Sequence, residues 1–300
     1  MRSSTIYSSL ISCFAAVASA QTTPVWETLP PTPQLPGNPA GTLTEINGVK
    51  IWHAEFGTAA AGQVPVLMLH GGFGNSDYYG KRPHLSSLST PSPQNRADSV
   101  GGRAGDVVKS LMAKHHVIVM DTRGHGRSTM DSTPFTYEQY ASDASALLET
   151  LGIAKAAWVG WSDMAIGTFA ALLDSHDSTL VDHAFAFGGG HNPQSTNATF
   201  SSSATYAAFI GRATKEYAAL QPTGDLKAFA AAADFARIKL GAKVTIADGQ
   251  YEEAVALAEP ALLNSWIAGS QRVTLTNVSH FAPLQDPDQF AAKVEDFLSA

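Results

Sequence analysis

Ser162 has the sequence setting of a nucleophile. It lies in GWSDM (160–164), where the apolar run AAWVGW (156–161) leads into the apolar segment AIGTFAALL. A serine on such a tight strand-to-helix turn presents its hydroxyl beside a helix N-terminus, which offers free N–H groups and a partial positive charge. Acyl transfer needs both a presented nucleophile and donors for the developing oxyanion. The same residues also fit an ordinary turn in which Ser162 caps the helix.

A glycine-rich turn in the first half of the chain offers further N–H donors. HGGFG (70–74) follows the apolar run VPVLML (64–69). Such a turn leaves backbone N–H groups open to a ligand, and together with the N–H of Asp163 it could form a two-donor oxyanion hole. A phosphate-binding loop is the alternative, but no lysine or further glycine follows at the spacing that such a loop needs.

A histidine and an acidic loop near the C-terminus could activate the serine. His280 follows the apolar run RVTLT (272–276), and a histidine just beyond a strand end can act as a general base. The run KVTIA (243–247) leads into DGQYEE (248–253), where a carboxylate could hold the histidine in the right tautomer. A solvated acidic loop is the alternative for that segment.

Six short apolar runs would supply the frame for these residues. Each is bounded by turns and is nearly continuous, which is typical of strands buried on both faces of a parallel sheet. They comprise residues 64–69, 116–121, 156–161, 183–187, 243–247 and 272–276. Before them, LTEINGVKIWHAEF (43–56) alternates around Asn47-Gly48, which is the strongest short signal for a β-hairpin.

Helical patterns lie between these runs. Thr136 and Gln139 predict a capping box, followed by an apolar stripe that Gly152 closes. Asp286 predicts the N-cap of the last helix, with Pro287 at its first position. The alternation of strands and helices predicts a doubly wound α/β sheet.

The chain order of the candidate residues points to one architecture. Serine, acid and histidine follow one another, each beyond the C-terminal end of a strand, and this order is specific to the α/β-hydrolase arrangement. From about residue 43 to the end, the sequence resembles the α/β-hydrolase superfamily, whose fold is a doubly wound, mostly parallel α/β sheet with a small helical cap. The resemblance rests on HGGFG, GWSDM, DTRGHGRST (121–129), IADGQYEE (246–253) and SHFAPLQDP (279–287). It is closest to the valacyclovir-hydrolase-like small-molecule esterases, which have a GWSDGG elbow.

The resemblance implies a catalytic triad. Ser162 would be the nucleophile, His280 the base and Glu252 the acid. Glutamate here takes the place of the aspartate that is usual in the family. Glu253 and Asp248 are the alternative acids on the same loop.

The resemblance also implies an oxyanion hole made by the N–H groups of Gly72 and Asp163. Met164 departs from the family, which has a second glycine at this position so that the helix can pack close to the strand. Methionine is flexible enough to fill a nearby gap without displacing the helix. We expect gap filling, because every other element of the triad is present.

The remaining sequence divides into segments of different character. Residues 1–20 combine one arginine, an apolar stretch and a small-residue ASA site, which is the pattern of a secretory signal peptide. Residues 21–41 predict an extended leader, and residues 42–300 predict the α/β-hydrolase domain. Within this domain, residues 84–106 predict a loop insertion and residues 192–240 a helical cap insertion. The protein is therefore expected to be secreted.

Composition narrows the class of partner. The 300 residues carry a net charge of −7 with no long run of either sign, which argues against nucleic acid. The one cysteine, Cys13, lies in the predicted signal peptide, so the mature chain would have no thiol nucleophile. No later segment is apolar enough to span a membrane, and no His, Cys or Asp cluster has metal-ligand spacing. We therefore expect a small-molecule substrate and neither a cofactor nor a metal.

Two sequons, at Asn197 and Asn277, fit a secreted chain. Asn197 lies in a Ser/Thr-rich stretch at the start of the predicted cap and is expected to be exposed. Asn277 lies three residues before the candidate base and follows a run predicted to be buried. Asn197 is therefore the expected glycan site.

These features predict a secreted serine hydrolase that acts on a carboxylic ester, lactone or related acyl bond of a small molecule. Two alternatives remain. One is a pseudoenzyme that binds a small molecule without turnover, and Met164 alone favours it. The other is a non-hydrolytic member of the fold, such as a lyase or cyclase.

Overall fold

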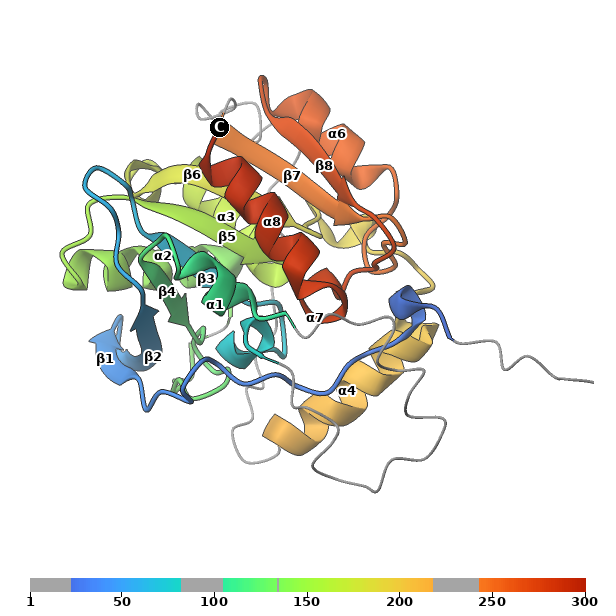
Figure 1. The fold of residues 1–300 in the computed structure, drawn as a ribbon, viewed down its shortest axis with the longest axis horizontal. Helices are drawn as coiled ribbons and strands as arrows, with labels where there is room; N and C mark the ends of the chain where they lie inside the picture. The colour runs from blue at the N-terminus through green and yellow to red at the C-terminus, as the bar shows by residue number, and fades with distance from the viewer. Residues whose placement is uncertain (1–22, 82–104, 134, 218–242) are drawn as a thin grey trace, which may run out of the picture.

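Eight strands form one sheet in the computed structural model, which describes residues 23–81, 105–133, 135–217 and 243–300 (Figure 1). Their order across the sheet is β1-β2-β4-β3-β5-β6-β7-β8. The β1–β2 and β2–β4 pairs are antiparallel, and all the others are parallel. The bounds are β1 Thr42–Ile46, β2 Val49–Phe56, β3 Val66–Leu69, β4 Val117–Met120, β5 Ala156–Trp161, β6 Val181–Phe187, β7 Val244–Gly249 and β8 Gln271–Leu275. This confirms the predicted doubly wound, mostly parallel α/β sheet.

Three predicted segments lie wholly or partly outside the described residues. These are the signal peptide (1–20), residues 84–104 of the loop insertion and residues 218–240 of the cap. Of the predicted leader, residues 23–41 are described. They run along the surface with one 3₁₀ turn, Val25–Glu27, and a single bridge between Gln34 and Lys81.

The central strands have the predicted burial, but the last one does not. Every residue of β3, β4, β5 and β7 is buried. β8 is the edge strand, and only Leu275 of its five residues is buried. The prediction that residues 272–276 form a strand buried on both faces is therefore wrong, because an edge strand leaves side chains facing solvent.

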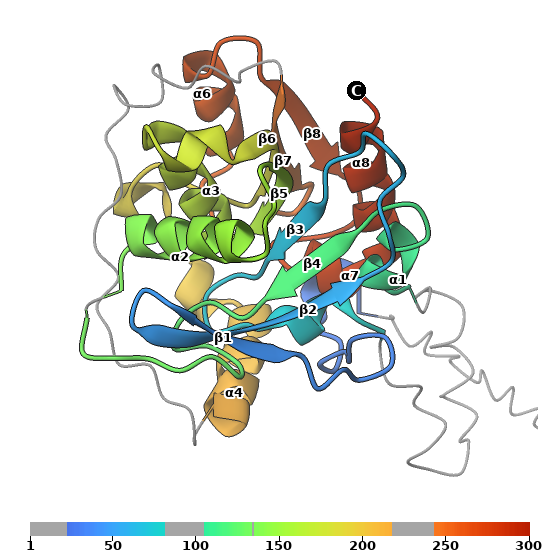
Figure 2. The same cartoon turned by 90° about the vertical axis from the view of Figure 1, so that its left-hand side faces the viewer.

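Two helical layers cover the sheet (Figure 2). Helices α2 (Tyr137–Thr150), α3 (Asp163–Leu173) and α6 (Glu259–Trp266) share one apolar core with the sheet, and α1 (Val107–Leu111) and α8 (Pro287–Leu298) share the other. Helix α4 (Ala204–Tyr217) belongs to the predicted cap, and α7 is the single turn Ala282–Gln285. Short 3₁₀ turns lie at Ser76–Tyr79 (η2), Asp177–Thr179 (η5), Pro193–Ser195 (η6) and Phe200–Ser202 (η7).

The predicted turn and cap residues are in place, with one exception. Asn47 and Gly48 have φ of 47° and 84°, as a tight type I′ hairpin requires. Asp286 accepts the N–H of Gln289 at 3.0 Å and caps α8. Thr136 accepts the N–H of Gln139 at 3.0 Å, but the Gln139 amide donates to the buried Asp143 and does not return to Thr136. Only half of the predicted capping box therefore forms.

No helix among the described residues is both long and apolar enough to cross a membrane.

Candidate active site

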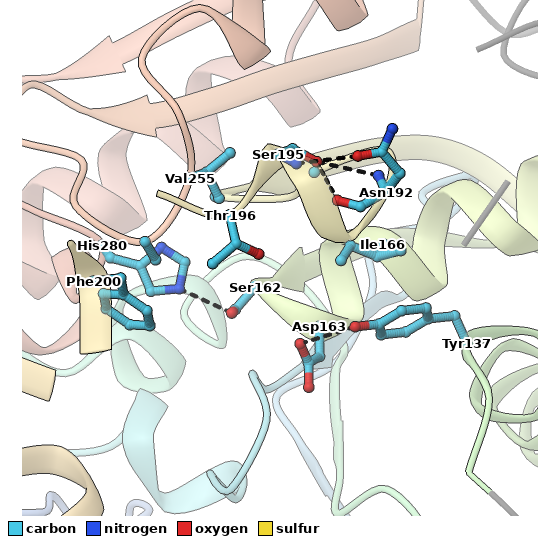
Figure 3. A pocket seen from close by; sticks show the side chains of 13 residues that line it. Tyr137, Ser162, Asp163, Ile166, Asn192, Ser195, Thr196, Phe200, Val255 and His280 are labelled. Carbon is cyan, nitrogen blue, oxygen red and sulfur yellow. Dashed lines mark hydrogen bonds between the residues drawn. The ribbon is translucent and has the colours of Figure 1, made fainter. Parts of the chain in front are cut away.

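Ser162 joins β5 to α3 in a backbone conformation that few non-glycine residues adopt. Its φ is 56° and its ψ is −118°, and its N–H donates to the carbonyl of Phe187 at 2.8 Å. Gly160 lets the helix start close to the strand, because a Cβ there would lie 2.2 Å from the carbonyl oxygen of Met164. Such backbone strain costs about 1–3 kcal/mol and clusters at active sites. The turn points the Ser162 hydroxyl toward His280 (Figure 3).

The three predicted triad residues meet in one hydrogen-bonded chain. Ser162 Oγ lies 2.8 Å from His280 Nε2, and His280 Nδ1 lies 2.9 Å from Glu252 Oε1. Glu252 Oε1 also accepts the N–H groups of Ala254 at 2.8 Å and Val255 at 3.2 Å. Because a carboxylate only accepts, His280 Nδ1 must be the donor toward it, and a neutral ring then leaves Nε2 to accept the serine O–H.

The electrostatic surroundings of His280 are acidic. Burial by itself lowers the pKa of His280, but the charge and hydrogen bond of Glu252, together with the charges of Glu253 and Asp163, outweigh it and raise the pKa above its ordinary value. These carboxylates favour the imidazolium form, which arises when His280 takes a proton from the serine.

Gly72 and Asp163, the two predicted oxyanion donors, line one cavity beside the serine. Asp163 is the first residue of α3, so its N–H is among those that a helix leaves without an intrahelical acceptor. A Cβ at Gly72 would lie 2.2 Å from Asp163 Oδ2, which makes any larger residue a poor fit there. The loop is held by His70, whose Nδ1 lies 2.8 Å from the Gly71 carbonyl and whose Nε2 accepts the N–H of Thr122.

Comparison with known proteins supports the fold. A profile of the alpha/beta hydrolase fold family matches residues 64–173, which contain both HGGFG and GWSDM. The structure of an enol-lactonase from Burkholderia xenovorans LB400 superposes with a TM-score of 0.61 and 19% identity, covering 86% of this chain and 100% of that one. The chain therefore has the α/β-hydrolase fold and is similar to that superfamily.

Two further solved structures have the same fold as this chain. The esterase RhEst1 from Rhodococcus sp. ECU1013 has a TM-score of 0.60 and 19% identity, covering 86% of this chain and 98% of its own. Est816, described as an N-acyl homoserine lactone degrading enzyme, has a TM-score of 0.56 and 19% identity over 85% of this chain and 100% of its own. At such identities the likeness shows the fold alone. It does not single out the valacyclovir-hydrolase-like members, so that closer resemblance stays a prediction.

The two alternative acids, Asp248 and Glu253, bind other groups. Asp248 accepts a hydrogen bond from Thr274 at 2.6 Å and from Arg272 at 3.3 Å. Glu253 accepts from Thr205 and Ser279. Of the three carboxylates that the sequence left open, Glu252 is the one hydrogen-bonded to the imidazole.

Met164 packs into the core beside the elbow. Its side chain is buried, and a Cβ added at Gly167 would lie 2.8 Å from Met164 Cε and 3.0 Å from its Sδ. The glycine that the family has at the position of Met164 is found here about one helical turn later, at Gly167. The Met164 side chain packs against Gly167 and fills the space that a Cβ would need there. Ser162 keeps the strained elbow conformation beside it. This arrangement matches the expected gap filling.

Met164→Gly is therefore expected to leave turnover per active site nearly unchanged and to lower stability. Emptied core volume and added backbone freedom at a helix start should cost on the order of 2–4 kcal/mol. Urea unfolding gives the stability, and active-site titration gives the turnover. Met164→Ala is the control, because it removes the side chain without the flexibility of glycine. A marked rise in turnover of Met164→Gly would show instead that Met164 distorts the elbow.

The carboxyl group of Asp163 also lines the site and is hydrogen-bonded to Tyr137. Burial raises the pKa of Asp163, and this effect outweighs the opposing hydrogen bond from the Tyr137 hydroxyl and the charge of His280. The Tyr137 hydroxyl donates to Asp163 Oδ1 at 3.3 Å (Figure 3). Tyr137 was missed from the sequence because nothing local to α2 shows that its first residue reaches the elbow.

Two cavities open beside Ser162. One, of about 280 Å³, has a mixed lining: polar groups of Tyr137, Asp163, Asn192, Ser195 and Thr196 lie among the apolar side chains of Ile166, Phe200, Ala254 and Val255. The other, of about 200 Å³, is walled by Phe73, Trp161, Phe200, Tyr206, Phe209 and Phe281. The residues that line these cavities could not be predicted from the sequence, because they come from separate loops and helices. Within the part of the chain that the structure describes, no cluster of His, Cys, Asp or Glu is placed to hold a metal ion.

Proposed function

We propose that this protein is a secreted serine hydrolase that cleaves a carboxylic ester, lactone or related acyl bond of a small molecule. The observation that carries the proposal is the hydrogen-bonded chain Ser162–His280–Glu252 at a strained strand-to-helix turn. An acyl-transfer site needs a nucleophile within hydrogen-bond reach of a base, and a third group that orients the base. The fold is shared with structures described as an enol-lactonase and an esterase, which supports the same reaction class.

The geometry leads to a two-step reaction. His280 Nε2 takes the Ser162 proton as Oγ attacks the carbonyl carbon, and the N–H groups of Gly72 and Asp163 bind the oxyanion. The imidazolium then gives its proton to the departing alcohol oxygen, which leaves an acyl-serine. A water molecule, deprotonated by His280, attacks the acyl-serine and releases the acid. Glu252 accepts from Nδ1 throughout and stabilises the transient positive charge.

The two cavities suit a small substrate with unlike ends. The smaller cavity gives an aromatic wall beside Ser162, and the larger one adds hydroxyl and amide groups among apolar side chains, with Asp163 and Phe200 shared by both. Esters with one apolar ring and one small polar part would fill both.

Labelling the purified mature protein with a fluorophosphonate probe tests the proposal. We expect a single adduct on Ser162 by mass spectrometry, and none in Ser162→Ala. A folded wild type that does not react would favour the pseudoenzyme. A wild type that reacts but hydrolyses no ester or lactone would favour a lyase or cyclase.

Secretion is part of the proposal, and the glycan sites offer a test. The structure reverses the expected exposure of the sequons: Asn277 is exposed in a turn, whereas Asn197 is half-buried and its Oδ1 accepts from Thr199. When the chain is produced in a eukaryotic secretory host, we expect Gln21 as the first residue and Asn277 at least as fully glycosylated as Asn197. N-terminal sequencing and glycopeptide mapping measure both. A mature protein that still begins at Met1 would contradict secretion.

A further inference from the structure

Glu253 stands next to the triad acid but holds a different set of groups. Its Oε1 accepts the hydroxyl of Thr205 at 2.5 Å and the hydroxyl of Ser279 at 3.1 Å. Thr205 lies in the first turn of α4, and Ser279 directly precedes His280. One carboxylate oxygen therefore joins the cap helix to the loop that carries the base.

Both hydroxyl partners are in fixed positions. Thr205 is 2% exposed and Ser279 is 1% exposed. Ser279 also accepts from the side-chain amide of Gln285 at 3.0 Å, and its N–H donates to the Gln285 amide oxygen at 2.7 Å. The Ser279 hydroxyl accepts from Gln285 and donates to Glu253. A displacement of Glu253 would therefore displace Ser279, the residue before the base.

The helix that Glu253 holds is part of the cleft wall. Tyr206 and Phe209 of α4 line the aromatic cavity beside Ser162. The position of α4 therefore determines the width of that cavity. Glu253 connects α4 to the loop that carries His280, called the histidine loop below.

The charge of Glu253 also acts on the base. The charged groups that act on His280 are Glu252 and Glu253 from the acid loop and Asp163 from α3. No lysine or arginine of the described residues lies within ion-pair distance of Glu253, so its charge is not neutralised by a direct partner. Burial raises the pKa of Glu253, although its two hydroxyl donors oppose this effect.

We propose that Glu253 is a positioning residue, which fastens α4 to the histidine loop through Thr205 and Ser279 and stabilises the imidazolium of His280 with its charge. The inference rests on the proposed function, in which His280 is the general base. A purely structural link would lower stability on removal but would leave the pH dependence of hydrolysis unchanged.

Glu253→Gln separates the charge from the contacts, because an amide oxygen can still accept both hydroxyls. Without the charge, the pKa of His280 should fall. His280 acts as a base in its neutral form, so more of it is active at acidic pH. The acidic limb of kcat/KM should then move to lower pH by roughly 0.3–1 unit. Asp248→Asn, in strand β7 directly before that loop, is the matched control, and its limb should stay in place, since Asp248 is bonded to Thr274 and Arg272.

Thr205→Val separates the contact from the charge, because it removes the hydroxyl and nearly keeps the shape. We expect KM for phenyl acetate to rise roughly three- to ten-fold while KM for methyl acetate and the acidic limb stay unchanged. If Glu253→Gln does not fold, Ser279→Ala tests the same link from the other side, with a loss of kcat expected. Superposable pH profiles for wild type and Glu253→Gln, or an unchanged KM for phenyl acetate in Thr205→Val, would overturn the proposal. A wild type that hydrolyses no ester or lactone would instead overturn the proposed function.

Discussion

Ser162→Ala is expected to lower turnover of p-nitrophenyl acetate by about 10⁶-fold, the scale of loss when a serine nucleophile is removed from a triad. The reaction that remains would come from the oxyanion donors and from binding alone. The fold should be unaffected, because alanine keeps the Cβ and the lost hydroxyl, at the edge of an open cleft, is bonded among the described residues only to His280. Initial rates and thermal unfolding of both proteins measure the two effects.

Two further variants control for this result. His280→Ala should be about as damaging as Ser162→Ala, because the members of a triad act as a unit. Ser162→Gly should be equally inactive but more stable than Ser162→Ala by about 1 kcal/mol, since glycine adopts a φ of 56° without strain. Retention of most of the activity in Ser162→Ala would show that the elbow was assigned wrongly.

The sequence predicts the placement of the triad well because its members lie at strand ends. The carboxyl ends of neighbouring parallel strands meet at one edge of a sheet, so residues just beyond β5, β7 and β8 come together. The Asn47-Gly48 hairpin and the Asp286 cap were also predicted correctly, because a few adjacent residues determine the backbone conformation there.

Features that depend on distant contacts were not predictable. β8 was predicted to be a strand buried on both faces, but it has only two apolar residues, Val273 and Leu275, and its place at the sheet edge leaves its polar side chains exposed. Gln139 has the capping-box spacing, but the buried Asp143 competes for its amide. Gly167 makes room for Met164, and this pairing shows only when the helix is packed against the sheet. The choice among Glu252, Glu253 and Asp248 likewise required the positions of Thr205, Thr274 and His280.

Glu252→Gln is expected to lower turnover by roughly 10²–10⁴-fold. The upper figure applies when an amide puts its NH₂ toward the histidine and forces the wrong tautomer. Here two backbone N–H groups, of Ala254 and Val255, bond the same oxygen that accepts from His280. They should hold the amide oxygen of the glutamine in that position and preserve the tautomer. The loss would then come mainly from the missing charge, which no longer stabilises the imidazolium.

Glu252→Gln is also expected to lower stability, because of the surroundings of the second carboxylate oxygen, Oε2. Glu252 Oε2 is buried and has no hydrogen-bond partner among the described residues. The glutamine NH₂ would occupy that position and bury donors without acceptors, at a cost of about 1–3 kcal/mol. Urea unfolding and the pH dependence of kcat measure the two effects, with Glu253→Gln as the neighbouring control. A hydrolysis rate near that of the wild type in Glu252→Gln, together with a loss of several hundred-fold in Glu253→Gln, would transfer the role of the acid to Glu253.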